Sequence, residues 1–154
     1  MYIVSMAFED GDKIPKKYTC EGEGINPSFQ IIDIPNSAIS LVLLSWDPDV
    51  PLEAGTNGNW DHWIVFNIST DNVIIDEGVE PEGIHGITTS KTHKYVPPCP
   101  PDREHRYFFK IYALDMLLTL SELATRADVE KAMKKHIIDE AQIMGTYCKK
   151  VNCK

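Results

Sequence analysis

Short hydrophobic runs alternate with turn-forming residues through residues 1–118. Gly, Pro, Asn and Asp recur there about every ten residues, a spacing typical of short strands joined by turns. The runs between the turns are rich in β-branched and aromatic residues, which favour strands. They cover residues 28–34, 39–46, 62–69, 72–76 and 106–115. This pattern predicts a mostly β fold, an antiparallel sandwich or barrel.

The pattern changes at residue 125, where apolar residues follow helical spacing. The predicted apolar face contains Val129, Ala132, Met133, Ile137, Ala141 and Met144. Thr125 and Asp128 form a capping-box start, and Gly145 is a typical stop. A break near His136 would divide this segment into two shorter helices. We therefore expect a β-sheet core with peripheral helices near the C-terminus, in a single domain over residues 1–154.

The first of three informative strand ends is the stretch SWDPDVP, residues 45–51. Alternate residues of a strand share a face, so Asp47 continues the row of Leu41, Leu43 and Ser45 to the rim of the core. Pro48 and Pro51 restrict the loop before any ligand arrives. The alternative is a plain turn in which the carboxylates of Asp47 and Asp49 accept from nearby backbone N–H groups.

The second strand end is WDHWIVFNI, residues 60–68. One predicted face contains Trp60, His62, Ile64, Phe66 and Ile68, and the other contains Trp63, Val65 and Asn67. Both faces are largely apolar, which predicts a central strand. His62 is then either a core histidine with satisfied hydrogen bonds or a ligand-binding group.

The third strand end follows a stiff loop that contains Pro97, Pro98, Pro100 and Pro101. In the next strand one face carries His105, Tyr107, Phe109 and Ile111, and the other carries Arg106, Phe108 and Lys110. A histidine and a tyrosine thus begin an inward-facing row. Their polar atoms either bond to buried backbone groups or serve a ligand.

If the three strand ends meet, they bring together Asp47, His62, His105 and Tyr107. Two imidazoles and a phenol offer N–H and O–H donors, and hydrogen bonds to an ionised partner are stronger than neutral ones. An ionised Asp47 would favour an imidazolium and fix its orientation, while Asp49 would stabilise the turn, or the two acids would exchange these roles. The sequence therefore predicts a small preorganised anion site.

The composition narrows the function classes. The net charge of −8 and the pI near 5.0 argue against nucleic acid or an anionic membrane as a bulk partner. No apolar run approaches the roughly 18 residues of a membrane-spanning helix. The N-terminal stretch lacks a basic flank followed by a long apolar run, so we expect no signal peptide and a cytoplasmic location.

The chain has four cysteines and no CxxC motif, which disfavours a zinc ribbon. In a reducing cytoplasm free thiols are the default state. Cys148 and Cys153 are close enough in sequence to pair.

Several segments resemble the phosphatidylethanolamine-binding protein family, which includes the Raf kinase inhibitor proteins. The matching segments are IPKKYTCEG (14–22), DPDVP (47–51), WDHWIVFNI (60–68), PCPPDREHRYFFKIYALD (98–115) and GTY (145–147). Their order and spacing are similar to those of the short bacterial and archaeal branch. The resemblance covers essentially the whole chain.

The resemblance implies an antiparallel β-sandwich with peripheral helices and a pocket for phosphate-type headgroups such as phosphoethanolamine. Carried over by position, the ligand-binding residues are Asp47, Val50, Pro51, Trp60, His62, Pro101, His105 and Tyr107. Asp102 and Glu104 depart from the family pattern by adding negative charge near His105. The short tail after residue 147 puts in doubt the helix that gates the pocket in longer relatives.

These observations favour a binding protein without cofactor, metal or catalytic residues, whose partner is a small anionic or phosphorylated ligand. The resemblance also allows inhibition of a kinase or protease, and a homodimer formed through the tail. The alternative is a hydrolase or metal-dependent enzyme that uses Asp47 with His62 and His105. Its nucleophile would be Ser45, which lacks a GxSxG motif, or Cys99, six residues before His105.

Overall fold

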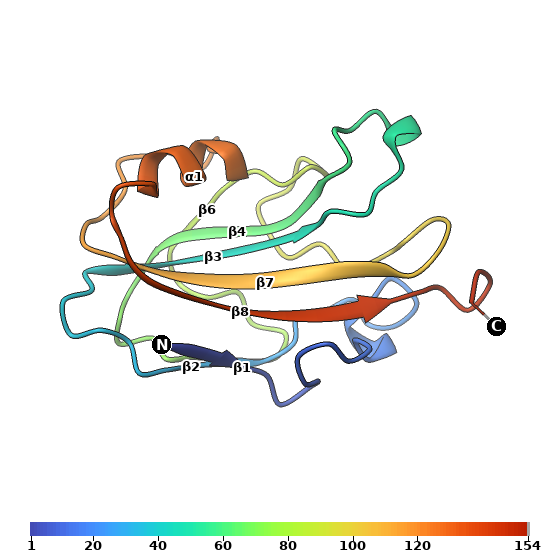
Figure 1. Cartoon of the computed structure of the whole chain (residues 1–154), viewed down its shortest axis with the longest axis horizontal. Coiled ribbons are helices and arrows are strands. Elements are labelled where there is room, and N and C mark those ends of the chain that lie inside the picture. The colour runs from blue at the N-terminus through green and yellow to red at the C-terminus, as the bar shows by residue number, and fades with distance from the viewer. Residues whose placement is uncertain (154) are drawn as a thin grey trace.

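The computed structural model describes residues 1–153 and shows three layers, with a helix and a small sheet on opposite faces of a larger sheet (Figure 1). In spatial order the larger sheet contains β6 (Ile84–His85), β4 (Trp60–Ile68), β3 (Ser40–Asp47), β7 (His105–Leu114) and β8 (Ile137–Tyr147). The smaller sheet contains β1 (Tyr2–Val4), β2 (Phe29–Ile32) and β5 (Ile74–Ile75). All strand pairs within both sheets are antiparallel, which confirms the predicted fold class.

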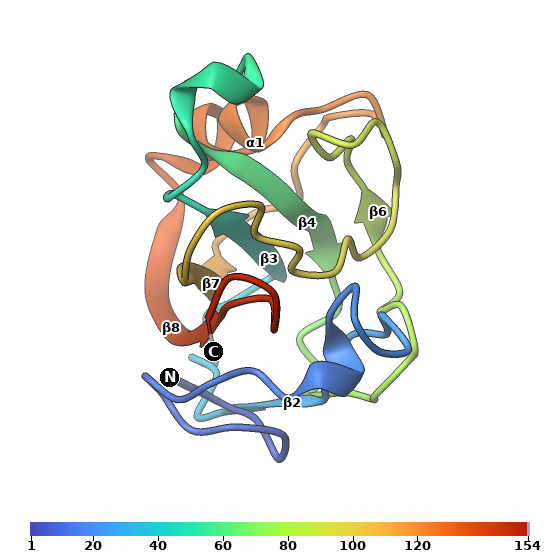
Figure 2. The ribbon, with the colours of Figure 1, turned by 90° about the vertical axis from the view of Figure 1, so that its right-hand side faces the viewer.

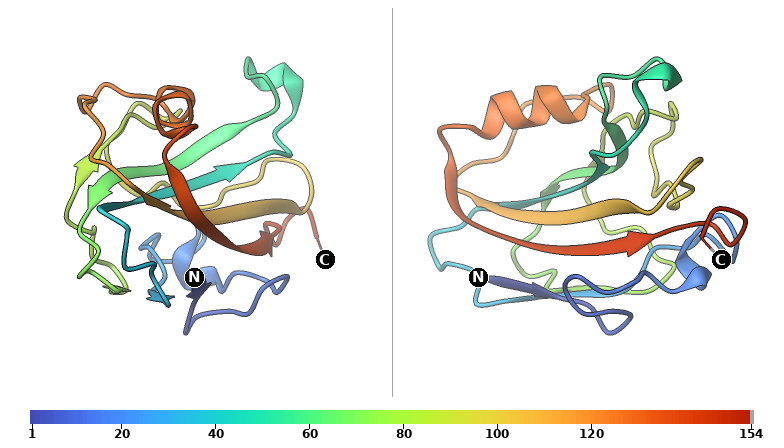
Figure 3. Two further views of the ribbon diagram at one scale, coloured as in Figure 1. Left: turned by 60° about the vertical axis from the view of Figure 1, so that its left-hand side comes forward. Right: turned by 45° about the vertical axis from the view of Figure 1, so that its right-hand side comes forward.

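The larger sheet is apolar on both faces because each face has a cover (Figure 3). Between the two sheets lie the side chains of Leu41, Leu43, Trp63, Tyr107, Phe109, Phe29 and Ile31. On the other face, Val42, Leu44, Ile64 and Phe66 pack in one cluster with Val129 and Met133 of α1 (Arg126–Met133). Burial on both faces explains the nearly continuous hydrophobic runs of β3 and β4.

The prediction of a tail helix is confirmed at its start and is wrong after Met133. Thr125 and Asp128 form the predicted capping box, but α1 is the single α-helix of the described chain and is followed by β8. β8 pairs with β7 from Leu114 to His105. Gly145 is a strand residue rather than a helix stop, and a Cβ there would come within 2.5 Å of the Ile14 side chain. Tertiary pairing thus overrides the helical spacing of this segment.

A register shift in β4 changes the direction of His62. Ser45 pairs with Trp63 and Trp46 pairs with Asp61, so His62 is an extra residue opposite β3. Such a β-bulge rotates the side chains before it relative to those after it. Ile64 and Phe66 therefore pack toward α1, and the prediction that His62 shares their row is wrong.

All four cysteines are paired. Cys20 bonds to Cys99 with a Cα–Cα distance of 5.4 Å, and Cys148 bonds to Cys153 at 5.9 Å. The sequence indicated the second pair as an option, whereas the first was not foreseen and the expected free thiols are not found. Within residues 1–153, no helix is long and apolar enough to cross a membrane.

Candidate functional site

A cavity of about 300 Å³ lies where β3 ends and where β4 and β7 begin. Figure 2 views this end of the molecule, where long loops surround the strand ends. The cavity is lined by Asp47, Val50, Trp60, His62, Ser90, Val96, Pro97, Cys99, Pro101 and Tyr107. The three strand ends singled out in the sequence therefore converge on one hollow.

The predicted site residues occupy two positions relative to this cavity. Six of them line it, namely Asp47, Val50, Trp60, His62, Pro101 and Tyr107. Pro51 lies next to Val50 and precedes the short 3-10 helix η2 (Leu52–Ala54), while His105 is fully buried and is not part of the lining. Ser90, Val96, Pro97 and Cys99 complete the lining, and only the loop prolines gave a sequence signal for this wall.

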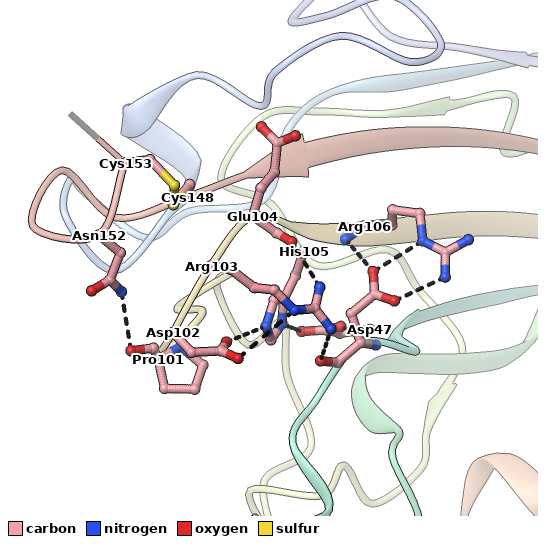
Figure 4. A network of polar contacts seen from close by, with 11 residues as sticks. Asp47, Pro101, Asp102, Arg103, Glu104, His105, Arg106, Cys148, Asn152 and Cys153 are labelled. Atoms are coloured by element: carbon pink, nitrogen blue, oxygen red, sulfur yellow. Dashed lines mark hydrogen bonds and ion pairs between the residues drawn. A yellow bond between two sulfur atoms is a disulfide. The ribbon is translucent and has the colours of Figure 1, made fainter.

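His105 is held between two carboxylates (Figure 4). Its Nδ1 lies 2.6 Å from Asp47 Oδ2, and its Nε2 lies 2.7 Å from Asp102 Oδ1. The hydrogen bond from His105 lowers the pKa of Asp102, which favours its ionised form. Because an ionised carboxylate can only accept, the Nε2–H of His105 donates to Asp102, while Nδ1 joins the same ring to Asp47. Asp47 thus orients an imidazole, as the sequence predicted.

Asp49 ties the loop after β3 to β7. Its carboxylate accepts from the backbone N, Nε and Nη2 of Arg106 at 2.9, 3.0 and 2.8 Å. Its own backbone N–H donates to Asp47 Oδ1 at 2.8 Å. The Arg106 guanidinium lowers the pKa of Asp49. Asp49 is therefore the acid that fixes the turn.

His62 differs from His105 because it presents a nitrogen to the cavity. Its Nδ1 donates to the backbone carbonyl of Val96 at 2.7 Å, and Nε2 has no hydrogen-bond partner among the described residues. Burial is the main reason that the pKa of His62 is lowered, although the Val96 carbonyl and the Asp47 and Asp61 carboxylates oppose the shift. The ring is therefore neutral at pH 7.

Tyr107 contributes an unused donor. Its ring meets the His62 ring edge-on, with centroids 5.3 Å apart, and its hydroxyl is buried without a hydrogen-bond partner in the described chain. Burial raises the pKa of Tyr107 most, and the charge of the Asp47 carboxylate and its approach to the hydroxyl, outside normal hydrogen-bond geometry, add to the shift, so the hydroxyl keeps its proton. A buried polar group without a partner is uncommon and calls for an explanation.

The opposite wall is a stiff loop. The Cys20–Cys99 disulfide joins it to the segment after η1 (Lys16–Tyr18), and the Cys20 backbone N–H donates to the Pro98 carbonyl at 3.0 Å. In the loop closed by the second disulfide, Asn152 Nδ2 donates to the Pro101 carbonyl at 3.0 Å (Figure 4). Trp60 Nε1 completes the rim by donating to Ser90 Oγ at 3.2 Å.

The structure bears on the three versions of the enzyme hypothesis, a cysteine nucleophile, a serine nucleophile and a metal site. Cys99 is bonded to Cys20, so it supplies no thiolate to His105. Ser45 Oγ is buried and has no hydrogen-bond partner within the described residues, so no base activates it. Across residues 1–153, no group of three or more His, Cys, Asp or Glu side chains has a geometry suited to a metal ion.

Comparisons with known proteins agree with this architecture. The model of the family described as phosphatidylethanolamine-binding protein matches residues 4–148. The chain belongs to this family. It is 48% identical to a UPF0098 protein of Chlamydia pneumoniae over 147 residues, which covers 96% of this chain and 98% of that protein. It is 40% identical to a UPF0098 protein of Methanothermobacter thermautotrophicus, with the same coverage.

Two solved structures share the fold. One is a crystal structure described as a phosphatidylethanolamine-binding protein homolog, CT736, of Chlamydia trachomatis. It is 45% identical with a TM-score of 0.93, covering 96% of this chain and 97% of that chain. The other is E. coli YbcL, which is 24% identical with a TM-score of 0.87 and covers 97% and 98%, and this similarity shows the fold alone.

Proposed function

We propose that this protein binds a small oxyanion of the phosphate-headgroup class in the cavity at the strand ends. The observation that carries the proposal is the buried hydroxyl of Tyr107, which has a proton to donate and no partner in the described chain. Leaving such a group unpaired costs roughly 1–3 kcal/mol, and a ligand oxygen would remove that cost. The family name, which refers to phosphatidylethanolamine, supports the same ligand class.

The surroundings of the hydroxyl support a binding role. A volume of about 300 Å³ is at the lower end of the range for small-molecule sites, which suits a headgroup rather than a whole lipid. The lining is mostly apolar, with a few polar atoms from Asp47, His62, Ser90 and Tyr107. An apolar lining excludes water and lowers the local dielectric constant, which strengthens each hydrogen bond made inside the cavity.

Tyr107→Phe tests the proposal because it removes a single oxygen atom. Without ligand, we expect unchanged or slightly increased stability, since an unpaired buried group is lost. Binding of phosphoethanolamine should weaken by about ten-fold, because one hydrogen bond contributes about 1.5 kcal/mol. Denaturant unfolding and isothermal titration calorimetry measure the two effects.

Tyr95→Phe is a matched control. The Tyr95 hydroxyl is also buried, but it donates to the Tyr18 carbonyl at 2.9 Å. Its removal should reduce stability by about 1 kcal/mol and leave affinity unchanged. If both variants bind phosphoethanolamine like the parent chain, Tyr107 is not a ligand-binding residue.

A regulatory role is the second part of the proposal. A phosphorylated or acidic side chain of a kinase or protease carries the same oxyanion chemistry, so a protein could occupy the cavity through one residue. Inhibition assays with and without saturating phosphoethanolamine test this role, because competition is expected only if the partner uses the cavity.

Assembly and location complete the proposal. A homodimer remains our proposal, with exposed apolar residues beside α1, such as Leu117 and Leu123, as its contact; light scattering after size exclusion measures the mass. A cytoplasmic location predicts reduced thiols, whereas the structure pairs all four cysteines. Alkylation of thiols in freshly lysed cells decides between these states.

A further inference from the structure

We infer that the cavity takes up its anion together with one proton, which His62 Nε2 holds between the ring and a ligand oxygen. This inference rests on the proposed function and names the ligand class more closely, as a singly charged oxyanion. It follows from which atoms around the cavity can donate a hydrogen bond and which cannot.

The position of the proton on the free ring is fixed by the backbone. A carbonyl oxygen can only accept, so the 2.7 Å contact with Val96 places the proton of His62 on Nδ1. In the neutral ring Nε2 then carries a lone pair. The atom presented to the cavity is therefore an acceptor, which repels the oxygen of a deprotonated ligand.

No other residue of the cavity supplies a positive charge. The described lining contains no lysine or arginine. Both ring nitrogens of His105 are already engaged, one by Asp47 and the other by Asp102, and this ring is not part of the lining. Asp47 adds a negative charge to the lining itself. An anion can therefore gain a charged partner here only if His62 becomes protonated.

The surroundings of His62 act on its charge in opposite directions, so a bound ligand can change its protonation state. Burial and the neighbouring His105 of β7 oppose the imidazolium, whereas the Val96 carbonyl, Asp47 from β3 and the adjacent Asp61 favour it. Tyr107 faces the ring with its edge and stays neutral. Asp61 is already paired, because Arg126 Nε donates to it at 2.6 Å. An oxyanion placed against Nε2 adds the attraction that the free protein lacks.

This linkage separates ligand classes. A phosphate diester or a carboxylate carries one negative charge, which one imidazolium and the Tyr107 hydroxyl can match. A dianionic phosphate monoester has a second charge without a partner near Asp47, so it should bind as its singly protonated form. Binding and proton uptake then depend on each other reciprocally.

Calorimetry with dimethyl phosphate tests the inference, because this diester has no ionisable proton of its own near neutral pH. Titrations of the full chain at pH 6.0–8.5, in two buffers of different ionisation enthalpy, count the protons exchanged. We expect uptake of about one proton per ligand in the upper part of this range, with affinity falling about ten-fold per pH unit. Phosphoethanolamine should take up more protons than dimethyl phosphate, because binding as the singly protonated form also consumes the proton that its dianion lacks; with a second pKa of about 6, this excess should grow from about half a proton near pH 6 toward one proton at the top of the range.

Two variants and one spectrum locate the proton. An amide cannot titrate, so His62→Gln should abolish proton uptake and make affinity independent of pH. His136→Gln is the matched control, since His136 pairs with Asp115 at the exposed end of α1 and should leave uptake unchanged. Nitrogen-15 spectra of the parent chain should show a neutral His62 ring in the absence of ligand. With dimethyl phosphate bound, they should show the ring protonated at both nitrogens.

The possible failures are distinguishable. If dimethyl phosphate binds the parent chain with no proton uptake and a flat pH profile, this inference is wrong while the proposed function stands. Uptake that persists in His62→Gln would also overturn it, because another group would hold the proton. If neither dimethyl phosphate nor phosphoethanolamine binds at pH 6, both the inference and the proposed function fail.

Discussion

On one side of the cavity, Asp47, His62 and Tyr107 project from β3, β4 and β7, whose backbones are joined by antiparallel pairing with a bulge at His62. On the other side, residues 96–101 belong to no strand or helix. This loop side is held by four prolines, by a disulfide and by the amide of Asn152. The strand side therefore depends on a hydrogen-bonded sheet, and the loop side depends on a few separate links.

The difference indicates how each side tolerates change. A sheet distributes its stabilisation over many backbone bonds, so a side chain on it is positioned even when a neighbour is altered. A loop without such a ladder depends on each link in turn. We expect substitutions on the loop side to change the shape of the cavity. Substitutions on the strand side should instead change the charges that line it.

The largest effect is expected from Cys20→Ser combined with Cys99→Ser. This pair closes a loop with a sequence separation of 79, for which loop closure predicts about 4 kcal/mol of stabilisation. Urea unfolding of the double variant should show a loss of this size, and dimethyl phosphate binding should weaken as the wall becomes mobile.

The matched control is Cys148→Ser with Cys153→Ser. Its separation of 5 predicts only about 2 kcal/mol. Equal losses in the two double variants would contradict the view that the longer link organises the loop side.

Asp47→Asn should have the next largest effect and acts on the strand side. The side chains of Asp47 and His105 are 4% and 0% exposed, and removal of one partner of a buried pair costs about 3 kcal/mol. Asp49→Asn is the control, because Asp49 is 13% and its partner Arg106 is 52% exposed, so a smaller loss of about 1 kcal/mol is expected. Unfolding in denaturant at pH 7 measures both, and a larger loss for Asp49→Asn would refute the ranking.

A smaller effect is expected from acid without ligand. The pKa of His62 is lowered below its ordinary value of 6.5, so the unfolded chain binds more protons than the folded chain just below that pH. Stability should therefore fall as pH drops through 6.5, and rising pH should restore it. Melting temperatures from pH 7 to 5.5 measure this trend, which should be weaker in His62→Gln.

Asn152→Ala should have the smallest effect. It removes one exposed hydrogen bond to the Pro101 carbonyl, so a loss below about 1 kcal/mol is expected. Carbon-13 shifts of the loop carbonyls should change near Pro101 and remain constant along β3. Changes of equal size on both sides would show that the two sides are not independent.

The sequence predicted the strand side better than the loop side. Period-two alternation placed Asp47 and Tyr107 on the inward rows of β3 and β7, and each of the five predicted runs overlaps a strand. His62, one of the predicted site residues, lines the cavity. The prediction that it shares a row with Ile64 and Phe66 was wrong. A β-bulge adds one residue to a strand and shifts the period-two alternation of its side chains. The position of such a shift cannot be read from the alternation itself.

Three strands escaped prediction for separate reasons. β1 and β6 are too short to show a period. The residues of β8 satisfy two periods, because Ile137, Ala141 and Met144 fit a helix while Ile143, Gly145 and Tyr147 alternate into the core. Only the partner strand β7 decides between them. The Cys20–Cys99 bond joins residues far apart in the chain, and no local pattern indicates such a pairing.

The longer disulfide also has a consequence for the denatured chain. It converts residues 20–99 into a covalent ring that carries Asp47, Trp60 and His62, with β7 and β8 on an open tail. An oxidised chain in urea should therefore have a smaller radius of gyration than a reduced one. When such a ring refolds, the proline wall is already tethered, and the open tail completes the site by docking beside β3.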